Sequence, residues 1–411
     1  MLKIPLAKPV SDEEMNKDMP KVLLVPTSDY IGHPFPQRQN HIFERIHSSG
    51  SFGVHVVRFN LFRTKRQESS VYVHDMPDLK IKPVSLYYLT NMTLHAVLID
   101  KLVRKEAIDV VVLSNLAPCF IYMLLYRNNV PCVFDLPDYF PVSATGYIVS
   151  PDSGLGKATA TAFEGMLKTI LKKCNKVTVA SCALLDYVIK LGVKDPVYVP
   201  NGVDVRFFDD YDGSGLRERF KVRQDEILVG YVGSLAFWLN LKPLLDGLNM
   251  AIKHNLHIKL LFVGGNLHID YVSKVKSWVS ERRLDDYVIW TGFVPYKEVP
   301  KYIAAMDLGV LPHDFNNPTG YYAGPNKIWE YLSQGKPVLA APIPEAVFYR
   351  DYIELVSDAE DYLDIFARYS KDPSPFMDKA KNGRELAKTM TWDKSASLME
   401  RTLFEAIGKK A

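Results

Sequence analysis

Two successive series of short apolar runs, each alternating with helix-like segments, constrain the fold of this 411-residue chain more than any other feature. The first series comprises residues 21–25, 54–59, 79–86, 108–113, 131–134, 176–180 and 197–199, of which 79–86 is the weakest candidate. The second comprises residues 227–231, 259–263, 288–290, 308–311, 338–340 and 353–356. Short continuous apolar runs are typical of strands buried on both faces, and alternation with helices predicts parallel sheets. We therefore expect an α/β fold with two doubly wound, Rossmann-like domains.

The break between the two series lies at Pro200-Asn201-Gly202-Val203-Asp204, where an Asn-Gly turn precedes a polar stretch. The sequence predicts a flexible N-terminal extension at 1–20, a first domain at 21–204, a second at 205–388 and a C-terminal helix at 389–411. Ligands of open parallel sheets bind beyond the carboxyl ends of the strands. The cleft between the two domains is therefore the expected site.

Charge and cysteine content exclude several classes of protein. A net charge of +3 gives no support for nucleic-acid binding. The four cysteines lie in apolar contexts without metal-ligand spacing, which favours reduced core cysteines in a cytoplasmic protein. We expect neither a membrane span nor a signal peptide. Residues 163–173 form a basic amphipathic segment that can lie on the inner face of a membrane, although a surface helix is the favoured interpretation.

The segment from Gly324 to Ala340 predicts one helix followed by one buried strand. Gly324 and Pro325 suit the cap and first position of the helix, and Gly335 suits its end. Lys327 and Glu330 are three residues apart and share one face near the helix N-terminus, where the backbone favours a phosphate. The carboxylate can accept hydrogen bonds from a ribose diol. An ordinary surface ion pair is the alternative.

Two further strand ends carry candidates. Gly233 and Ser234 follow the first strand of the second series, where glycine allows close approach of a ligand. A tight turn without a ligand explains them equally well. Gly292 precedes Phe293 and Val294, which can pack on a nucleotide base, with a plain loop as the alternative. Walker and nicotinamide fingerprints are both missing.

The first half offers polar residues near the expected cleft. His33 lies in a long loop after the first strand, and Arg38 lies in the helix that follows this loop. Both can reach a phosphate or a hydroxyl, and either can also be a solvated loop residue. Asp138, next to Tyr139, follows a buried strand, where a carboxylate can bind sugar hydroxyls or accept a proton. Helix capping or an Asx turn explains Asp138 equally well. The sequence contains no nucleophile elbow of the Gly-x-Ser-x-Gly type.

Several of these segments together resemble the retaining glycosyltransferases of the GT-B fold. Val199 to Asp204 resembles their linker, and Glu330 to Val338 resembles their donor-site helix and strand. The segments beginning at Gly233 and Gly292 fall in the matching order. The best match is glycosyltransferase family 4, also called group 1, in a branch with an Arg-Gln-x-His helix, here Arg38 to His41. The resemblance covers nearly the whole chain after residue 20.

The resemblance implies a transferase that takes a nucleotide-sugar donor (UDP- or GDP-sugar) in the second half. The acceptor, a glycan, a lipid-linked molecule or another hydroxyl compound, would bind mainly in the first half. No cofactor or metal is implied, because the helix N-terminus and the Lys327 ammonium would neutralise the leaving diphosphate. The catalytic candidates are Lys327 and Glu330, to which the resemblance gives the diphosphate and the ribose, together with Asp138 from its place after a buried strand. The other donor candidates are Gly32, Gly233, Ser234, Lys242, Gly292, Phe293, Val294, Gly324, Pro325 and Asn326, and the acceptor candidates are His33, Arg38, Asp138 and Tyr139. The final helix would cross back to the first domain.

The chain departs from the family pattern at two places. Tyr322 stands where the family often has the first of two glutamates, and Ser234 stands where it often has arginine, with Lys242 as an approximate replacement for the following lysine. These departures keep two alternatives open. One is a non-catalytic nucleotide-sugar binding subunit, and the other is a GT-B-like sugar-nucleotide epimerase, which would need further carboxylates in the cleft.

Overall fold

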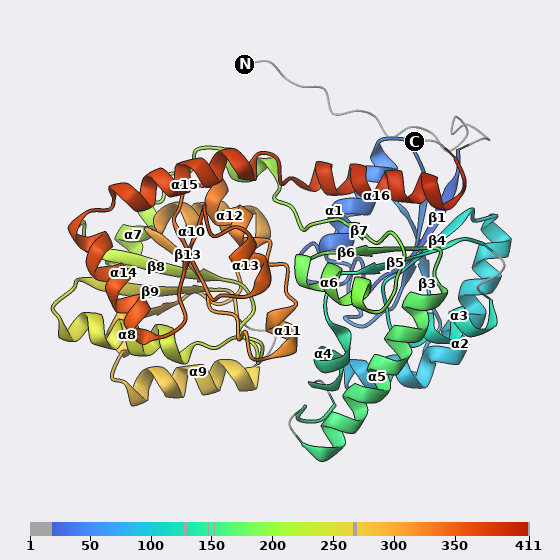
Figure 1. Cartoon of the computed structure of the whole chain (residues 1–411), viewed down its shortest axis with the longest axis horizontal. Helices are drawn as coiled ribbons and strands as arrows, with labels where there is room; N and C mark the ends of the chain where they lie inside the picture. Colours follow the sequence, from blue (N-terminus) through green and yellow to red (C-terminus); the bar gives the residue numbers. More distant parts are fainter. Residues whose placement is uncertain (1–18, 127–129, 147, 152, 266–268, 410–411) are drawn as a thin grey trace.

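The computed structural model describes residues 19–126, 130–146, 148–151, 153–265 and 269–409. Most of the extension predicted at 1–20 lies outside these residues. Two lobes lie side by side, and each contains a parallel sheet between layers of helices (Figure 1). The α/β fold class predicted from the alternating apolar runs is therefore confirmed.

The first domain holds a parallel sheet in the order β3-β2-β1-β4-β5-β6-β7. Its strands are β1 (Lys21–Val25), β2 (Gly53–Arg58), β3 (Tyr72–Asp75), β4 (Val110–Leu113), β5 (Cys132–Leu136), β6 (Lys176–Val179) and β7 (Val197–Tyr198). Its helices are α1 (Arg38–Ser48), α2 (Val84–Glu106), α3 (Ala117–Leu125), α4 (Phe140–Gly146), α5 (Gly154–Lys173) and α6 (Cys182–Lys190). The order reverses between β1 and β4, and ligands bind at such switch points.

The strand predicted at 79–86 is wrong. Strand β3 lies at Tyr72–Asp75, and Val84 begins the long helix α2. The sequence concealed β3 because it is a short edge strand with partly exposed side chains, paired only with β2. Leu79, which suggested a buried strand, is exposed in the connection before α2.

The second domain repeats this plan in the order β10-β9-β8-β11-β12-β13. Its strands are β8 (Ile227–Val232), β9 (Ile258–Val263), β10 (Val288–Trp290), β11 (Leu308–Leu311), β12 (Val338–Ala340) and β13 (Glu354–Leu355). Its helices are α7 (Ser214–Arg219), α8 (Lys242–Lys253), α9 (Ile269–Glu281), α10 (Val299–Ala305), α11 (Pro318–Tyr321), α12 (Lys327–Ser333), α13 (Pro344–Phe348), α14 (Ala359–Lys371) and α15 (Ser374–Ala387). Short 3-10 turns are η1 (Val205–Phe208), η2 (Asp285–Tyr287) and η3 (Tyr296–Glu298).

The last helix, α16 (Trp392–Ala406), returns to the first domain (Figure 1). Its buried residues Trp392, Met399 and Leu403 join a core cluster that also contains Val22 and Phe43 from the first domain. Burial of three large apolar side chains contributes several kcal/mol, at roughly 1.5–3 kcal/mol each. The helix therefore ties the two domains together, as the GT-B resemblance implied.

The helix that carries Lys327 begins later than the sequence indicated. Its cap is Asn326, and Gly324 and Pro325 lie before it. Gly324 instead permits a close approach between the domains, because a Cβ there would lie 2.6 Å from the carbonyl oxygen of Ala180. The helix ends as predicted, since Gly335 has a φ of 65°.

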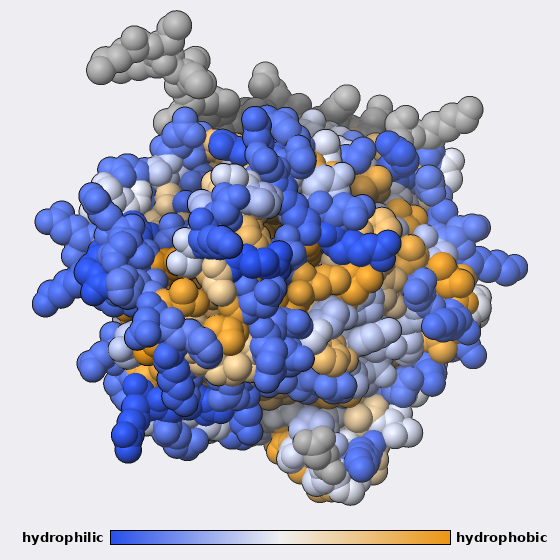
Figure 2. All heavy atoms as spheres, turned by 60° about the vertical axis from the view of Figure 1, so that its left-hand side comes forward, coloured by the Kyte–Doolittle hydropathy of each residue, from blue (hydrophilic) through white to orange (hydrophobic). Residues whose placement is uncertain are grey.

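Helix α5 faces the first-domain core with the apolar side chains of the predicted amphipathic segment. Phe163, Leu167, Ile170 and Leu171 are buried there. These side chains are not available to a bilayer, so membrane association stays a prediction without support from this helix. Figure 2 shows a face on which hydrophilic residues dominate and apolar residues form separate patches. None of the helices among the described residues has the length and apolar character needed to cross a membrane.

Candidate functional site

Three cavities with shared walls occupy the cleft between the two domains. The N-side cavity, of about 470 Å³, is lined mainly by the first domain and by residues 313–326. The C-side cavity, of about 320 Å³, is lined mainly by glycine-rich loops of the second domain. The central cavity, also about 320 Å³, shares Asp138 with the N-side cavity and Lys327 with the C-side cavity. A ligand can therefore extend from one domain to the other through one continuous cleft.

Lys327 and Glu330 form an ion pair, which the sequence offered as the alternative to their ligand-binding roles. The Lys327 Nζ lies 2.8 Å from the Glu330 Oε2, and the Asn326 Nδ2 donates to the Glu330 Oε1 at 2.7 Å. Glu330 has no exposed surface, and this burial raises the pKa of its carboxyl while the neighbouring ammonium of Lys327 opposes the rise. Lys327 lines two cavities, whereas Glu330 lies beneath Asn326 and Lys327.

The loops at the carboxyl ends of β8, β9 and β10 form the wall of the C-side cavity. Gly233 and Ser234 line it, as do Phe293 and Val294. Phe293 is half exposed, so its ring offers an open apolar surface. Gly292 lies outside the lining and accepts a hydrogen bond from the Gly264 N–H at 2.9 Å. The four donor candidates Gly233, Ser234, Phe293 and Val294 therefore lie on one wall of one cavity.

Lys242 and Gly32 lie away from the three cavities. The Lys242 ammonium stacks over the Trp278 ring, 5.3 Å from its centroid. The Gly32 N–H donates to the buried Asp29 Oδ1 at 2.9 Å, and a Cβ at Gly32 would lie 2.1 Å from the Asp29 Oδ2. Gly32 thus shapes the loop after β1, while Phe35 and Gln37 face the cleft in its place.

Arg38 touches the central cavity but is committed to protein contacts. Its guanidinium donates to both Asp135 carboxylate oxygens at 3.1 and 3.2 Å, and to Pro200 O and Asn201 Oδ1. These contacts join α1, β5 and the domain linker. Arg38 therefore positions the cleft walls, and only one of its N–H groups is left for a ligand.

Asp138 opens into the cleft where the two domains meet. Its side chain is exposed and lines both the N-side and the central cavity. Desolvation raises the pKa of this carboxyl to about 6, with Asp135 adding to the shift and Arg38 opposing it. A carboxylate with a pKa near neutrality can accept a hydrogen bond or a proton from a hydroxyl.

The other acceptor candidates lie on either side of the cavity wall. His33 lines the N-side cavity, its Nδ1 is 2.9 Å from Phe35 O, and burial lowers its pKa. Tyr139 does not line a cavity; it stacks on Tyr322 with ring centroids 4.7 Å apart. Tyr322, which stands at the position of a family glutamate in the sequence, therefore packs on the first domain. Gly324, Pro325 and Asn326 all line the N-side cavity.

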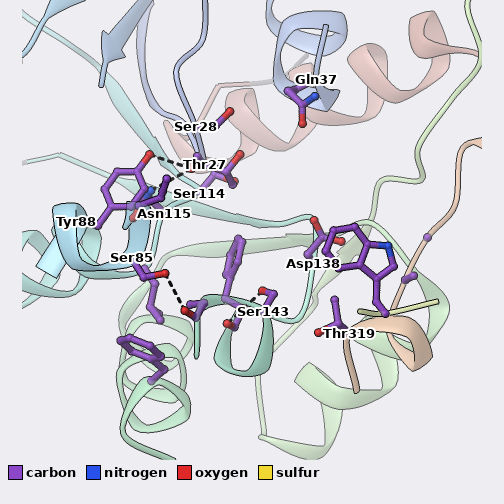
Figure 3. Close-up of a pocket in the computed structure, with 18 of the residues that line it drawn as sticks. Thr27, Ser28, Gln37, Ser85, Tyr88, Ser114, Asn115, Asp138, Ser143 and Thr319 are labelled. Atoms are coloured by element: carbon purple, nitrogen blue, oxygen red, sulfur yellow. Dashed lines mark hydrogen bonds between the residues drawn. The ribbon is translucent and has the colours of Figure 1, made fainter. Parts of the chain in front are cut away.

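Sequence reasoning missed several residues that line the cleft. Ser114 and Asn115 line the N-side cavity directly after β4, and the strand-end rule predicts such a place (Figure 3). Trp238 and His313 come from loops of the second domain. Arg66 reaches the C-side cavity from a first-domain loop, and no local pattern indicated it.

Among the described residues, no three His, Cys, Asp or Glu side chains gather closely enough to hold a metal ion. The arrangement instead offers backbone-rich loops, the ion pairs of Arg38 and Lys327 and the accessible carboxylate of Asp138 along a single cleft.

Two family models match successive parts of the chain. The model for Glycosyltransferase Family 4 matches residues 46–207, and the model for glycosyl transferases group 1 matches residues 226–372. The chain belongs to the family 4 (group 1) glycosyltransferases. The two matches fall on the two domains, so the family's two-domain organisation is present in this glycosyltransferase chain.

A curated relative supports the same family. It is the TuaH protein of Bacillus subtilis (strain 168), whose name assigns it provisionally as a teichuronic acid biosynthesis glycosyltransferase. It is 25% identical over 230 residues, which cover 54% of this chain and 55% of the relative. The alignment thus spans about half the length of the curated relative.

Solved structures share the whole fold at low identity. Sucrose-phosphate synthase from Thermosynechococcus elongatus is 19% identical with a TM-score of 0.75, covering 94% of this chain and 100% of that one. Anabaena Alr3699/HepE in complex with UDP-glucose is 17% identical with a TM-score of 0.71, covering 94% of this chain and 99% of that one. These matches establish the GT-B fold of the present glycosyltransferase.

Proposed function

We propose that this chain is a retaining glycosyltransferase that transfers a sugar, of the hexosyl type, from a UDP- or GDP-sugar to a hydroxyl of a glycan or lipid-linked acceptor. The observation that carries the proposal is the central cavity, which Asp138 and Lys327 both line. A donor on the second domain and an acceptor on the first would meet there. The UDP-glucose in the HepE complex supports a nucleotide-sugar donor, and the name of TuaH supports a place in cell-surface polysaccharide or glycoconjugate synthesis.

Donor binding would exchange the partners of Lys327. Both Glu330 oxygens already accept hydrogen bonds, from Asn326 and Lys327. Ribose hydroxyls that donate to Glu330 would release the Lys327 ammonium toward the diphosphate. The base would lie against Phe293 and Val294, beside the backbone of Gly233 and Ser234. Backbone N–H groups in such loops suit phosphate oxygens.

In the proposed transfer step, negative charge develops on the leaving diphosphate. The acceptor oxygen forms a bond to the anomeric carbon while the bond from that carbon to the diphosphate oxygen breaks. The electron pair leaves with the nucleoside diphosphate, and a phosphate oxygen of the leaving group takes the hydroxyl proton. Retention then needs no protein nucleophile. Asp138 would hold the acceptor hydroxyl, and positive groups near Lys327 would stabilise the leaving diphosphate. We propose that this stabilisation needs no metal ion.

The two alternatives make different demands on the cleft. An epimerase would need several carboxylates and no acceptor site, whereas Asp138 is the one Asp or Glu among the described residues that line the three cavities. The N-side cavity also provides space for an acceptor. A non-catalytic subunit would bind the donor without turnover.

A donor panel tests the proposal directly. The protein is incubated with UDP- and GDP-sugars, and release of the nucleoside diphosphate is measured with and without glycan acceptors. Release with free sugar or glycoside as the second product supports the transferase. Conversion to an altered sugar nucleotide would establish the epimerase, and binding without any turnover would establish the non-catalytic subunit.

We also propose a cytoplasmic protein that meets its acceptor at the inner face of the cell membrane. A lipid-linked acceptor would bring it there, because the apolar side chains of α5 are buried. Flotation with anionic liposomes that contain the acceptor lipid should recover the protein, and liposomes without it should recover less. Failure of the protein to float with either kind of liposome would contradict this localisation.

A further inference from the structure

The N-side cavity has a polar end made of uncharged side chains. Thr27 and Ser28 follow β1, Ser114 and Asn115 follow β4, and Gln37 precedes α1 (Figure 3). Thr27, Ser114 and Asn115 already donate hydrogen bonds within the protein, and their side-chain oxygens can still accept hydrogen bonds from ligand hydroxyls. Such groups suit a polyhydroxylated ligand.

The cavity carries no positive side chain that could hold a phosphate. None of the described residues that line it is Lys or Arg, and Asp138 contributes a negative charge. Its two histidines are neutral near pH 7, because burial lowers the pKa of His33 and lowers that of His313 to about 4. Phosphate sites in proteins generally use Arg or Lys. A phosphate in this cavity would therefore lose its hydration and meet a net negative wall.

The part of the cavity formed by α2, α4 and α5 reaches the surface and is mainly apolar, although Ser85 and Ser143 also line it. Val84 and Leu89 come from α2, Phe140 from α4 and Phe163 from α5. Val84 is 43% exposed, so this apolar end opens to solvent. An apolar group attached to the acceptor would be covered here as it leaves the cleft.

One buried hydroxyl in this cavity lacks a partner. The Thr319 side chain lies in the cavity wall opposite the α2 side (Figure 3), the residue is 9% exposed, and its Oγ1 makes no hydrogen bond within the protein. Buried polar groups without partners are rare, and they cost stability unless water or a ligand satisfies them. A ligand hydroxyl beside Trp238 and His313, which line the same cavity, would provide that partner.

We propose that the N-side cavity takes an uncharged sugar carrying an apolar aglycone, and excludes sugar phosphates, as the acceptor of the transfer. This inference rests on the proposed function and adds the chemical class of its acceptor. It predicts that neutral sugars are preferred over sugar phosphates, whereas the name of sucrose-phosphate synthase suggests a phosphorylated sugar for that enzyme.

Paired acceptors test this class. With a donor that the wild-type protein hydrolyses, transfer is measured to octyl glycosides, the matching free sugars and their 6-phosphates. We expect kcat/KM to fall in that order, with the phosphate at least roughly 10-fold below the free sugar. Sugar phosphates that outperform the neutral sugars would overturn the inference. Failure of every UDP- and GDP-sugar to release a nucleotide would instead overturn the proposed function.

Two variants locate the effect within the cavity. Val84→Asp should lower kcat/KM for the octyl glycoside while leaving the free sugar unchanged. Leu94→Asp is the matched control, because Leu94 is equally exposed on α2 but does not line the cavity. Thr319→Val should raise the acceptor KM without changing the donor KM. Equal octyl-glycoside kinetics for Val84→Asp and Leu94→Asp would contradict the apolar end.

A second, independent observation concerns the positive charge of the C-side cavity. Arg66 and Lys327 are the cations among the described residues that line it, and Glu330 neutralises Lys327 at 2.8 Å. Arg38, which lines the central cavity, is neutralised by Asp135. The Arg66 side chain is exposed and has no carboxylate within ion-pair distance among the described residues. It therefore provides the unbalanced positive charge of this cleft.

The backbone holds Arg66 in place even though its side chain is exposed. The Arg66 N–H and the Gln67 N–H both donate to Ile31 O, at 2.7 and 2.9 Å. The Gln67 Nε2 donates to His33 O at 3.0 Å, and Arg58 donates to Thr64 O. The loop is thus fastened to the connection that follows β1, and it brings a first-domain cation to the glycine loops of the second domain.

The geometry assigns Arg66 as a diphosphate-binding residue. It comes from the first domain and supplies positive charge that the second domain lacks. Ser234 stands where the resembled family often has arginine, and Lys242 packs on Trp278 outside the cavity. A nucleoside diphosphate carries at least two negative charges, and a guanidinium pairs well with phosphate oxygens. This assignment also rests on the proposed function.

Nucleotide binding without any acceptor tests Arg66. UDP, GDP and the matching nucleosides are titrated into the wild-type protein, Arg66→Gln and the control Lys65→Gln, which changes a neighbouring exposed cation outside the cavities. We expect Arg66→Gln to raise the Kd of the preferred diphosphate by roughly 10-fold or more, with nucleoside binding and the Lys65→Gln variant unchanged. Equal diphosphate affinity in all three proteins would overturn the assignment. A wild-type protein that binds neither UDP nor GDP would overturn the proposed function instead.

Discussion

Each domain contributes one ion pair to the cleft, and the two pairs differ in whether the cation can still contact a ligand. Arg38 and Asp135 are 3.1 Å apart with side chains 6% and 0% exposed, and further contacts with Pro200 and Asn201 occupy the arginine. Lys327 and Glu330 are 2.8 Å apart, and the lysine side chain is 21% exposed along two cavities. The first pair therefore fixes the domain linker, while the second can exchange its partner for a ligand.

Removing Arg38 should produce the largest effect, and the effect should be on stability. Arg38→Met leaves Asp135 buried without its cation, which typically costs about 3–5 kcal/mol. Denaturant unfolding measures the loss. Arg38→Met/Asp135→Asn should recover part of it, because the uncompensated charge is gone. If the single variant keeps wild-type stability, the structural interpretation of this pair is wrong.

Asp138→Asn should act on turnover. We propose that its carboxylate holds the reacting hydroxyl, and loss of such a group typically lowers the rate about 10²-fold or more. The Kd of the nucleotide should stay unchanged, because Asp138 lines the N-side and central cavities only. Steady-state kinetics with parallel titration of UDP or GDP separates the two effects. A variant with normal kcat and weakened nucleotide binding would contradict this division.

Changing the Lys327–Glu330 pair should weaken donor binding with a smaller effect on stability. Glu330→Gln removes the acceptor proposed for the ribose hydroxyls, and hydrogen bonds to charged groups are worth about 1.5–3 kcal/mol. We expect the nucleotide Kd to rise at least roughly 10-fold, measured by calorimetry. Lys379→Gln breaks the surface pair of Lys379 with Glu354 and serves as a control. Equal affinities for both variants would contradict the ribose contact.

The raised pKa of Asp138 predicts opposite effects of pH on activity and stability. Activity should fall as the pH falls through about 6, because the protonated carboxyl no longer accepts the hydrogen bond. An acid whose folded pKa is raised binds its proton more tightly in the folded state, so its contribution to stability declines between pH 4 and 6 and stays lost above. The Tm of Asp138→Asn relative to wild type should therefore be higher at pH 8 than at pH 4. A pH-independent difference in Tm would contradict the shift.

Chelation should have the smallest effect. We propose that Lys327 and Arg66 supply the positive charge at the diphosphate. Transfer rates in excess EDTA should match those in added Mg²⁺. A rate that depends on added metal would show that these cations do not suffice.

The two ion pairs also show what sequence can predict. Lys327 and Glu330 lie three residues apart on one helix, so local periodicity predicts their contact. Arg38 and Asp135 are 97 residues apart, and their contact depends on the order of strands β1, β4 and β5. The alternating apolar runs predicted both sheets for the same local reason. The edge strand β3 was missed because its partly exposed residues lack the apolar run of a central strand.

Distance along the chain also explains which residues of the cleft the sequence indicated and which it did not. Gly233, Ser234, Phe293 and Val294 were found because strand ends predict loops at the cleft. Arg66 lies in a loop whose position depends on backbone contacts with Ile31, which no local pattern encodes. Tyr322 stands at the position of a family glutamate, and its ring stacks on Tyr139 across the domain boundary, a contact that no local pattern encodes.

The most direct test is a crystal structure of the protein with UDP-glucose, or with the GDP-sugar if that donor binds. The account predicts the diphosphate in the C-side cavity, with Lys327 released from Glu330 and the ribose hydroxyls in its place. The anomeric carbon should face the side of Asp138. A nucleotide whose phosphates contact Arg38, or that occupies the N-side cavity while Lys327 and Glu330 stay paired, would contradict the proposed division of the cleft.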